Sequence, residues 1–235
     1  METYLVLIII AGIVAMDTTA GPQILVSEPI VSCSILGFLF GRPETGLMIG
    51  MVFQLLWLGY MPLGGVRFSD GNMGSFIATA SLFTAGRIFD FDVNTLNAAM
   101  VFALFYSIIV SISGQHMSTV VHLMNGKRSD RLTARLEGNE SLSITWFHLL
   151  GAGSSFLRGG AMALVLVPIG TLLCSSVLLM SAALVQSLAR VFPVIWGTVF
   201  ASAILLLWTK GKKSFLFIGF IGGFLWILLI ISQNV

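Results

Sequence analysis

Long runs of apolar residues, separated by short polar segments, are the main pattern of this chain. The clearest runs cover residues 100–113 (extending toward 121), 161–180, 192–208 and 214–231, and a shorter run covers 4–16. A helix needs about 20 mostly apolar residues to cross a membrane. The pattern therefore predicts an all-α polytopic membrane protein, in which residues 4–16 form a further span if their helix extends.

The first half of the chain is less regular than the second. Residues 24–41 are apolar but contain Glu28 beside a proline, residues 46–66 are rich in glycine, and residues 73–89 are apolar but short. Broken helices are tolerated in lipid only where the freed backbone is buried in protein or lines a cavity, and such segments often mark the binding site of a transporter. Residues 17–75 are therefore predicted to form a re-entrant, site-bearing region. The alternative is an ordinary kinked helix pair with a polar loop.

Charged residues gather in two segments of the second half. One covers residues 125–143 and the other is the lysine cluster at 210–213. Cytoplasmic loops of membrane proteins carry an excess of Lys and Arg, so both segments are predicted to be charged cytoplasmic loops. The two predicted spans between these loops, 161–180 and 192–208, bring the chain back to the same side of the membrane, so the two assignments agree. Residues 144–158, including Arg158, are then expected to be interfacial or half-inserted.

Composition supports the membrane prediction and excludes other classes. Hydrophobic residues make up 57% of the chain and charged residues 9%, whereas about 25% of a soluble domain is charged. The net charge of +2 gives no basic excess for binding nucleic acid. Cys33 and Cys174 lie in apolar runs and are interpreted as packing residues. No metal or nucleotide motif is present, and the first run lacks the flanks of a signal peptide, so residues 1–235 are predicted to form one membrane domain.

Polar side chains inside the apolar segments are the candidate functional groups, because placing them in a membrane is costly. Asp17 ends the first run and is at least as well explained as a helix-terminal acid, and helix capping is an adequate explanation of Glu28. The amide of Gln54 suits sugar hydroxyls, although a hydrogen bond between helices explains it equally well. Trp57 and Tyr60 offer apolar faces for a sugar ring.

Asp70 and Asn72 form a second candidate group, between two broken segments with glycine-rich flanks. A carboxylate accepts hydrogen bonds from two adjacent hydroxyls, which is a common way to bind a sugar. The alternative is a solvated loop with an ion pair between Arg67 and Asp70. Gln115 and His116 belong to a later span, where a polar stripe would face a cavity.

Four segments carry a family resemblance. They are EPIVSCSILGFLFGRPETGLMIG at 28–50, QLLWLGYMPLGG at 54–65 with Asp70 beyond it, SGQ at 113–115 and SITWFH at 143–148. Together they resemble membrane subunit IIC of the mannose/fructose/sorbose family of bacterial sugar phosphotransferase systems. The resemblance covers most of the chain in order and is weakest near the C-terminus. Gln54 is more similar to the amino-sugar branch of the family, from which Ser69–Gly71 departs.

The resemblance implies an all-helical fold with re-entrant hairpins in the bacterial inner membrane, which imports a hexose or an amino sugar. It also implies the partners, namely membrane subunit IID and the soluble phosphocarriers IIA and IIB, with trimers of IIC–IID pairs and an elevator motion. No catalytic residue and no cofactor are expected in this chain, because no His or Cys has the context of a phosphoryl carrier.

We expect Gln54, Asp70, Asn72 and Gln115 to bind the sugar hydroxyls, with Trp57 or Tyr60 stacking on the ring. One alternative is a transporter or vitamin-binding subunit that is not coupled to phosphotransfer. Another is an intramembrane serine protease, which would require Ser154 or Ser155 to meet His148 or His116.

Overall fold

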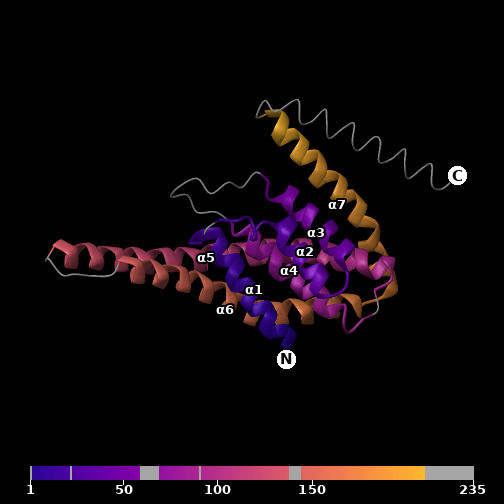
Figure 1. Cartoon of the computed structure of the whole chain (residues 1–235). Coiled ribbons are helices and arrows are strands. Elements are labelled where there is room, and N and C mark those ends of the chain that lie inside the picture. Colours follow the sequence, from indigo (N-terminus) through magenta and orange to yellow (C-terminus); the bar gives the residue numbers. More distant parts are fainter. Residues whose placement is uncertain (1, 22, 59–68, 90, 138–143, 210–235) are drawn as a thin grey trace.

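The computed structural model describes residues 2–21, 23–58, 69–89, 91–137 and 144–209, and these residues form seven helices joined by short connections (Figure 1). The helices are α1 (Glu2–Thr19), α2 (Pro29–Leu39), α3 (Pro43–Leu56), α4 (Gly71–Ala85), α5 (Val93–Glu137), α6 (Ile144–Leu178) and α7 (Ala182–Thr209). The predicted span at 214–231 lies outside the described residues.

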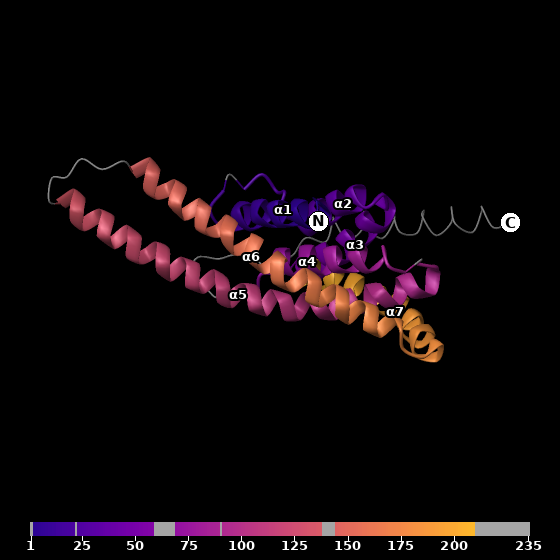
Figure 2. The same ribbon diagram turned by 90° about the horizontal axis from the view of Figure 1, so that it is seen from below.

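Four of these helices, α1, α5, α6 and α7, are long and apolar enough to cross a membrane. Figures 1 and 2 show α5 and α6 side by side, continuing together beyond the rest of the bundle. The charged segment that begins at residue 125 is helical as far as Glu137, and residues 138–143 lie outside the described part.

Residues 144–158 are continuous with the span that follows them, because α6 is one helix from Ile144 to Leu178. Polar residues suggested an interfacial segment, but tertiary partners accommodate them. Ser154 donates to Asn125 on α5 at 3.1 Å, and Arg158 is only 4% exposed.

The three helices that follow α1 are short, as the prediction of broken segments requires. α2, α3 and α4 contain 11, 14 and 15 residues, fewer than the roughly 20 that a span needs. Pro29 and Pro43 each stand in the first turn of a helix, where the missing N–H is not needed. Gly41 has a positive φ of 70° in the turn between α2 and α3, a conformation that glycine adopts without strain.

α4 forms the centre of the bundle and contacts α1, α2, α3, α5 and α6. Every residue of α4 except Asn72 and Thr84 is buried. Gly74 allows α5 to approach closely, since a Cβ there would lie 2.5 Å from the backbone oxygen of Ser107. The polar residues at the start of α4 are therefore enclosed by other helices.

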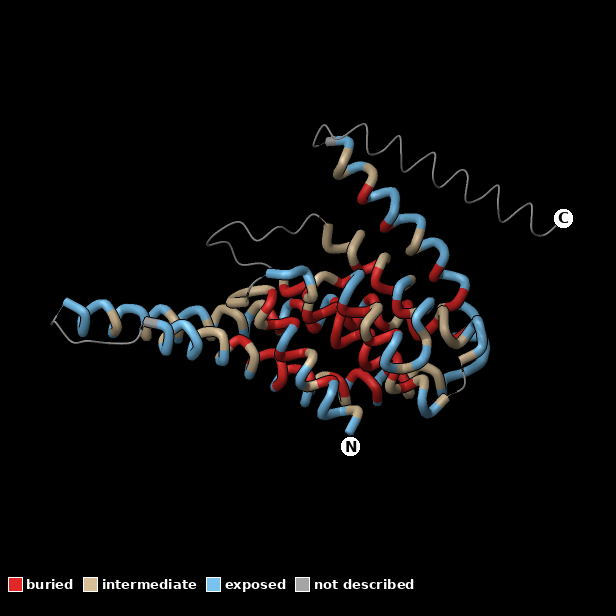
Figure 3. The backbone as a smooth tube through the Cα atoms, in the orientation of Figure 1, coloured by how far each residue is buried: buried red, intermediate tan, exposed pale blue. Residues whose placement is uncertain are grey.

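Exposure follows the same arrangement. Figure 3 shows the buried residues concentrated where the helices pack together, whereas the far ends of α5 and α6 are exposed. Large apolar side chains also remain exposed on the long helices, for example Leu157, Leu172 and Val194. Apolar surface of this kind is stable against lipid and is unusual in a soluble monomer.

Candidate functional site

Asp70 is the N-cap residue of α4, and its side chain caps the start of that helix. Its Oδ1 accepts a hydrogen bond from the backbone N–H of Met73 at 3.2 Å. Aspartate is favoured at this position because the first N–H groups of a helix have no partner within it. The backbone N–H of Asp70 donates to the carbonyl oxygen of Ser111 on α5 at 3.0 Å, so the start of α4 is attached to α5 as well.

Arg158 on α6 is the ionic partner of Asp70. Its Nη1 lies 2.5 Å from Oδ2 of Asp70, and the side chains of Arg158 and Asp70 are 1% and 6% exposed. The two residues are 88 positions apart in the sequence. The predicted alternative partner, Arg67, lies outside the described residues. Asp70 is thus held by a residue that the sequence suggested only as an interfacial group.

The pair is also attached to α5. Nη1 of Arg158 donates to the carbonyl oxygen of Gly114 at 3.3 Å. Gly114 provides the necessary space, because a Cβ there would lie 2.8 Å from Cβ of Asp70 and 3.2 Å from Cε of Met162. The ion pair therefore joins three helices, α4, α5 and α6, at one buried point.

The guanidinium of Arg158 is not fully satisfied. Its Nη2 is buried and has no hydrogen-bond partner among the residues that the structure describes. A buried donor without a partner loses its hydration and gains nothing in return, which costs about 1 to 3 kcal/mol. An orphaned group of this kind next to a predicted binding site is a candidate contact for a ligand.

Two of the predicted sugar-binding residues, Asn72 and Gln115, are close in the sequence to residues of this junction. Asn72 is in the first turn of α4 and Gln115 follows Gly114 on α5, and both are half-buried. Neither side chain forms a hydrogen bond with another described residue. The structure thus brings the backbone of the Asp70–Asn72 and Gly114–Gln115 segments into one neighbourhood.

The predicted aromatic residues have different outcomes. The ring of Trp57 lies against the start of α4, since a Cβ on Gly71 would be 2.5 Å from its Cδ2. Trp57 therefore belongs to the same neighbourhood as Asp70. Tyr60 lies outside the described residues, so its predicted role stays a prediction.

Gln54 is engaged elsewhere. Its Nε2 donates to Oε2 of Glu28 at 2.7 Å, and its Oε1 accepts from the backbone N–H of Ile30 at 3.2 Å. These bonds connect α3 to the start of α2, which is the helix–helix alternative that the sequence left open. Glu28 stands at the N-cap position of α2, but its side chain makes no capping bond and pairs with Gln54 instead.

Asp17 has a structural role in the connection between α1 and α2. It is buried, and its two carboxylate oxygens accept hydrogen bonds from the backbone N–H groups of Ile24 at 2.8 Å and Ser27 at 3.0 Å. Gln23 and Leu25 in this connection have positive φ values of 52° and 67°, which non-glycine residues seldom adopt. These contacts agree with the interpretation of Asp17 as a helix-terminal acid.

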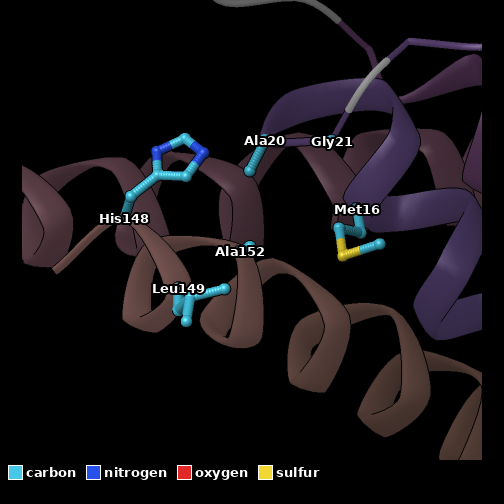
Figure 4. A pocket seen from close by; sticks show the side chains of 6 residues that line it. All are labelled: Met16, Ala20, Gly21, His148, Leu149 and Ala152. Atoms are coloured by element: carbon cyan, nitrogen blue, oxygen red, sulfur yellow. The ribbon is translucent and has the colours of Figure 1, made fainter. Parts of the chain in front are cut away.

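The protease alternative has no support in the hydrogen bonds. Ser154 contacts Asn125 and the backbone of Gly151, while Ser155 accepts a bond from Thr19 at 3.0 Å. His148 lines a hollow of about 390 Å³ together with Met16, Ala20, Gly21, Leu149 and Ala152, which are the residues labelled in Figure 4. Within the described ranges, neither serine is hydrogen-bonded to a histidine, and no cluster of His, Cys, Asp or Glu is suited to bind a metal ion.

Arg158 and Gly114 are the residues that sequence reasoning missed. A single arginine in an otherwise apolar helix is itself a signal, because an ionisable group at such a position needs an internal partner. Gly114 precedes the predicted ligand Gln115, but only the tertiary packing shows that it accommodates Asp70.

Comparison with known proteins adds the family. The chain matches the family model described as "PTS system sorbose-specific iic component" over residues 2–232. The sorbose-specific EIIC component of Klebsiella pneumoniae is 22% identical over 201 residues, which cover 83% of this chain and 70% of that protein. The mannose-specific EIIC component of Escherichia coli (strain K12) is 23% identical over 137 residues, which cover 58% of this chain and 46% of that protein, less than half of its length.

A solved structure supports the fold. The mannose transporter ManYZ, determined by cryo-EM in complex with microcin E492, contains a chain that superposes with a TM-score of 0.60 at 18% identity. The superposition covers 94% of this chain and 85% of that chain. Because the family model matches residues 2–232, almost the whole chain, this multi-pass protein of the bacterial inner membrane belongs to the family of PTS sorbose-specific IIC components.

Proposed function

We propose that this chain is the sugar-translocating IIC subunit of a phosphoenolpyruvate-dependent phosphotransferase system, which binds a hexose or an amino sugar and carries it across the membrane. The observation that carries the proposal is the buried junction of α4, α5 and α6, where the Asp70–Arg158 pair joins the first turn of α4, which contains Asn72, to the Gly114–Gln115 segment of α5. The names of the relatives, which are sorbose- and mannose-specific EIIC components, support the substrate class.

The chemistry of this junction suits an uncharged, hydroxyl-rich solute. An amide both donates and accepts hydrogen bonds, as does a sugar hydroxyl, so Asn72 and Gln115 match hydroxyls in either direction. The paired charges of Asp70 and Arg158 sum to zero, so the site carries no excess charge that an ionic substrate would have to balance. Trp57, packed beside Gly71, supplies an apolar ring next to these polar groups.

Gln54 and Asp70 take indirect roles in this proposal. The amide of Gln54 is bound to Glu28 and Ile30, and both carboxylate oxygens of Asp70 have partners in Met73 and Arg158. These residues hold the short helices around the sugar. Tyr60 remains a proposed stacking residue on sequence grounds alone.

Transport requires the site to open to each side of the membrane in turn. We propose that the short helices move as a block in an elevator motion. The α2–α3 hairpin is suited to this because it is tightly packed: a Cβ on Gly37 would lie 2.8 Å from Cα of Gly46. Subunit IID would complete the site in a trimer of IIC–IID pairs. IIA and IIB would supply the phosphoryl group, and IIB would transfer it to the sugar and trap the product as an anion.

The proposal is tested by uptake of labelled mannose, N-acetylgalactosamine and sorbose into cells that express this chain with and without its IIA, IIB and IID partners. Uptake that requires the partners and yields a phosphosugar is the expected result. Uptake without the partners would instead indicate an independent transporter with the same fold. Absence of uptake with every partner expressed in the membrane would contradict sugar transport.

A further inference from the structure

Arg158 uses only part of its hydrogen-bonding capacity on Asp70. Arginine and a carboxylate often pair through two parallel N–H···O bonds. Here one nitrogen, Nη1, contacts both Oδ2 of Asp70 and the carbonyl oxygen of Gly114. The other carboxylate oxygen accepts the N–H of Met73 at the start of α4. The pair is therefore not bidentate, and Nη2 of Arg158 has no acceptor among the described residues.

The unoccupied nitrogen lies in a place where water has little access. The side chain of Arg158 is 1% exposed, and Nη2 has no acceptor in the described part of the chain. A charged donor in such surroundings gains more from a new hydrogen bond than a donor in water does. Two predicted sugar-binding residues are close in the sequence to the groups that hold Nη1: Asn72 is two positions after Asp70, and Gln115 follows Gly114.

We propose that Arg158 is a specificity-determining residue of the transport site, whose Nη2 donates a hydrogen bond to one oxygen of the bound sugar. Asp70 and the Gly114 carbonyl then act as positioning groups, since they fix Nη1 and so direct the remaining nitrogen. This inference rests on the proposed function and adds to it the residue that distinguishes one hydroxyl position from the others.

The test couples a change in the protein with a change in the sugar. The apparent KM for uptake is measured for the transported sugar and for its single-deoxy analogues, with the full complex of wild type and of Arg158→Lys. Lysine keeps the positive charge beside Asp70 but has one nitrogen in place of the planar pair. In wild type, removal of the hydroxyl that Nη2 binds is expected to raise the KM about tenfold or more, as suits a hydrogen bond to a charged group.

In Arg158→Lys the same deoxy analogue and the parent sugar are expected to have nearly equal KM values, while the other analogues keep their wild-type ratios. This loss of discrimination at one position is a readout that a purely structural arginine would not change. If Arg158→Lys alters the KM of every analogue by the same factor, Nη2 serves an acceptor within the protein and the inference is wrong.

Two further variants keep the test decisive. Arg128→Lys changes a different arginine, which is half-buried and donates from Nη1 to Oδ1 of Asn125 far along α5, and it should leave all KM ratios unchanged. Should Arg158→Lys fail to reach the membrane, the double variant Asp70→Asn/Arg158→Gln removes both charges and is measured with the same sugars, with the same loss of discrimination expected. Wild type that transports no sugar would overturn the proposed function, whereas wild-type transport with unchanged discrimination in the variants would overturn only this inference.

Discussion

Two aspartates begin neighbouring helices in this protein, and their surroundings are opposite. Asp70 starts α4 and accepts the N–H of Met73, while Asp92 precedes α5 and accepts the N–H of Thr95 at 2.7 Å. The carboxylate of Asp70 is buried and paired with Arg158, whereas Asp92 is exposed. Each residue accepts a backbone N–H three positions further along, which is a usual role of aspartate at the start of a helix.

The difference shows what tertiary packing adds to a local role. At Asp92 the carboxylate bonds only to nearby residues of its own helix start, so its loss should affect little else. At Asp70 the same group also holds a charge on α6, and through it the carbonyl of Gly114 on α5. A change at Asp70 or Arg158 should therefore disturb three helices and the proposed site together.

The largest effect is expected when one member of the buried pair is removed. Arg158→Leu leaves the carboxylate of Asp70 buried without its cation, and breaking a buried pair in this way costs about 3 to 5 kcal/mol. The free energy of unfolding in mixed detergent micelles measures the loss. Asp70→Asn on its own should abolish uptake and lower stability, because Arg158 then keeps a buried charge without its anion.

The double variant Asp70→Asn/Arg158→Gln distinguishes pairing from the separate contributions of the two residues. It contains no unpaired charge, so it should be more stable than Arg158→Leu or Asp70→Asn alone. Additive losses from the single changes would show that the two side chains do not depend on each other, contrary to the 2.5 Å contact.

The next largest effect should come from the glycine that makes room for Asp70. Gly114→Ala places a Cβ 2.8 Å from Cβ of Asp70, and overpacking of this kind costs about 1 to 3 kcal/mol. Gly126→Ala is the matched control on the same helix, because nothing lies within 4 Å of its added Cβ. The control should be neutral or slightly stabilising, since alanine favours helix. Equal unfolding free energies for the two variants would mean that the close approach of Asp70 to α5 is not required.

The hydrogen bond between Gln54 and Glu28 is less buried than the Asp70 site and more buried than Asp92. Gln54 and Glu28 are half-buried and share a bond of 2.7 Å. Gln54→Ala should cost about 1 kcal/mol of unfolding free energy, the usual net value of one hydrogen bond. The exposed Gln186 on α7 is the control and should show no loss as Gln186→Ala. If Gln54→Ala is fully stable but raises the KM for sugar, then Gln54 binds the sugar directly, as the sequence first suggested.

Much of the architecture followed from the sequence because long apolar runs can satisfy their backbone in lipid only as helices. The short segments of residues 17–75, interrupted by glycine and proline, likewise indicated broken helices. Pairings between distant residues were not accessible in the same way. The partner of Asp70 lies on α6, and no local pattern shows that Arg158, 88 positions away, is that partner.

The same limit applies to the candidate site. Sequence reasoning selected Asp70, Asn72 and Gln115, which the structure places at one junction, because polar groups in apolar segments need a reason to be there. It also selected Gln54, whose amide bonds within the α2–α3 pair, so that its binding to the sugar stays a prediction. An amide that binds a sugar and one that joins two helices have the same local sequence signature, and only the contacts separate them.

The smallest effect is expected at Asp92, where it can be seen through pH. Hydrogen bonds from the hydroxyl and then the backbone N–H of Thr95 hold the pKa of Asp92 below its ordinary value. A lowered pKa in the folded protein contributes stability above the pKa of the unfolded chain, and this contribution disappears as the pH falls through the folded pKa.

Asp92→Asn keeps a capping oxygen but cannot titrate. The thermal midpoint of wild type should therefore fall slightly more than that of Asp92→Asn between about pH 6 and about pH 3, with the difference reduced by salt. Superimposable pH profiles would show that this exposed cap contributes nothing beyond its hydrogen bonds, which would widen the contrast with Asp70 further.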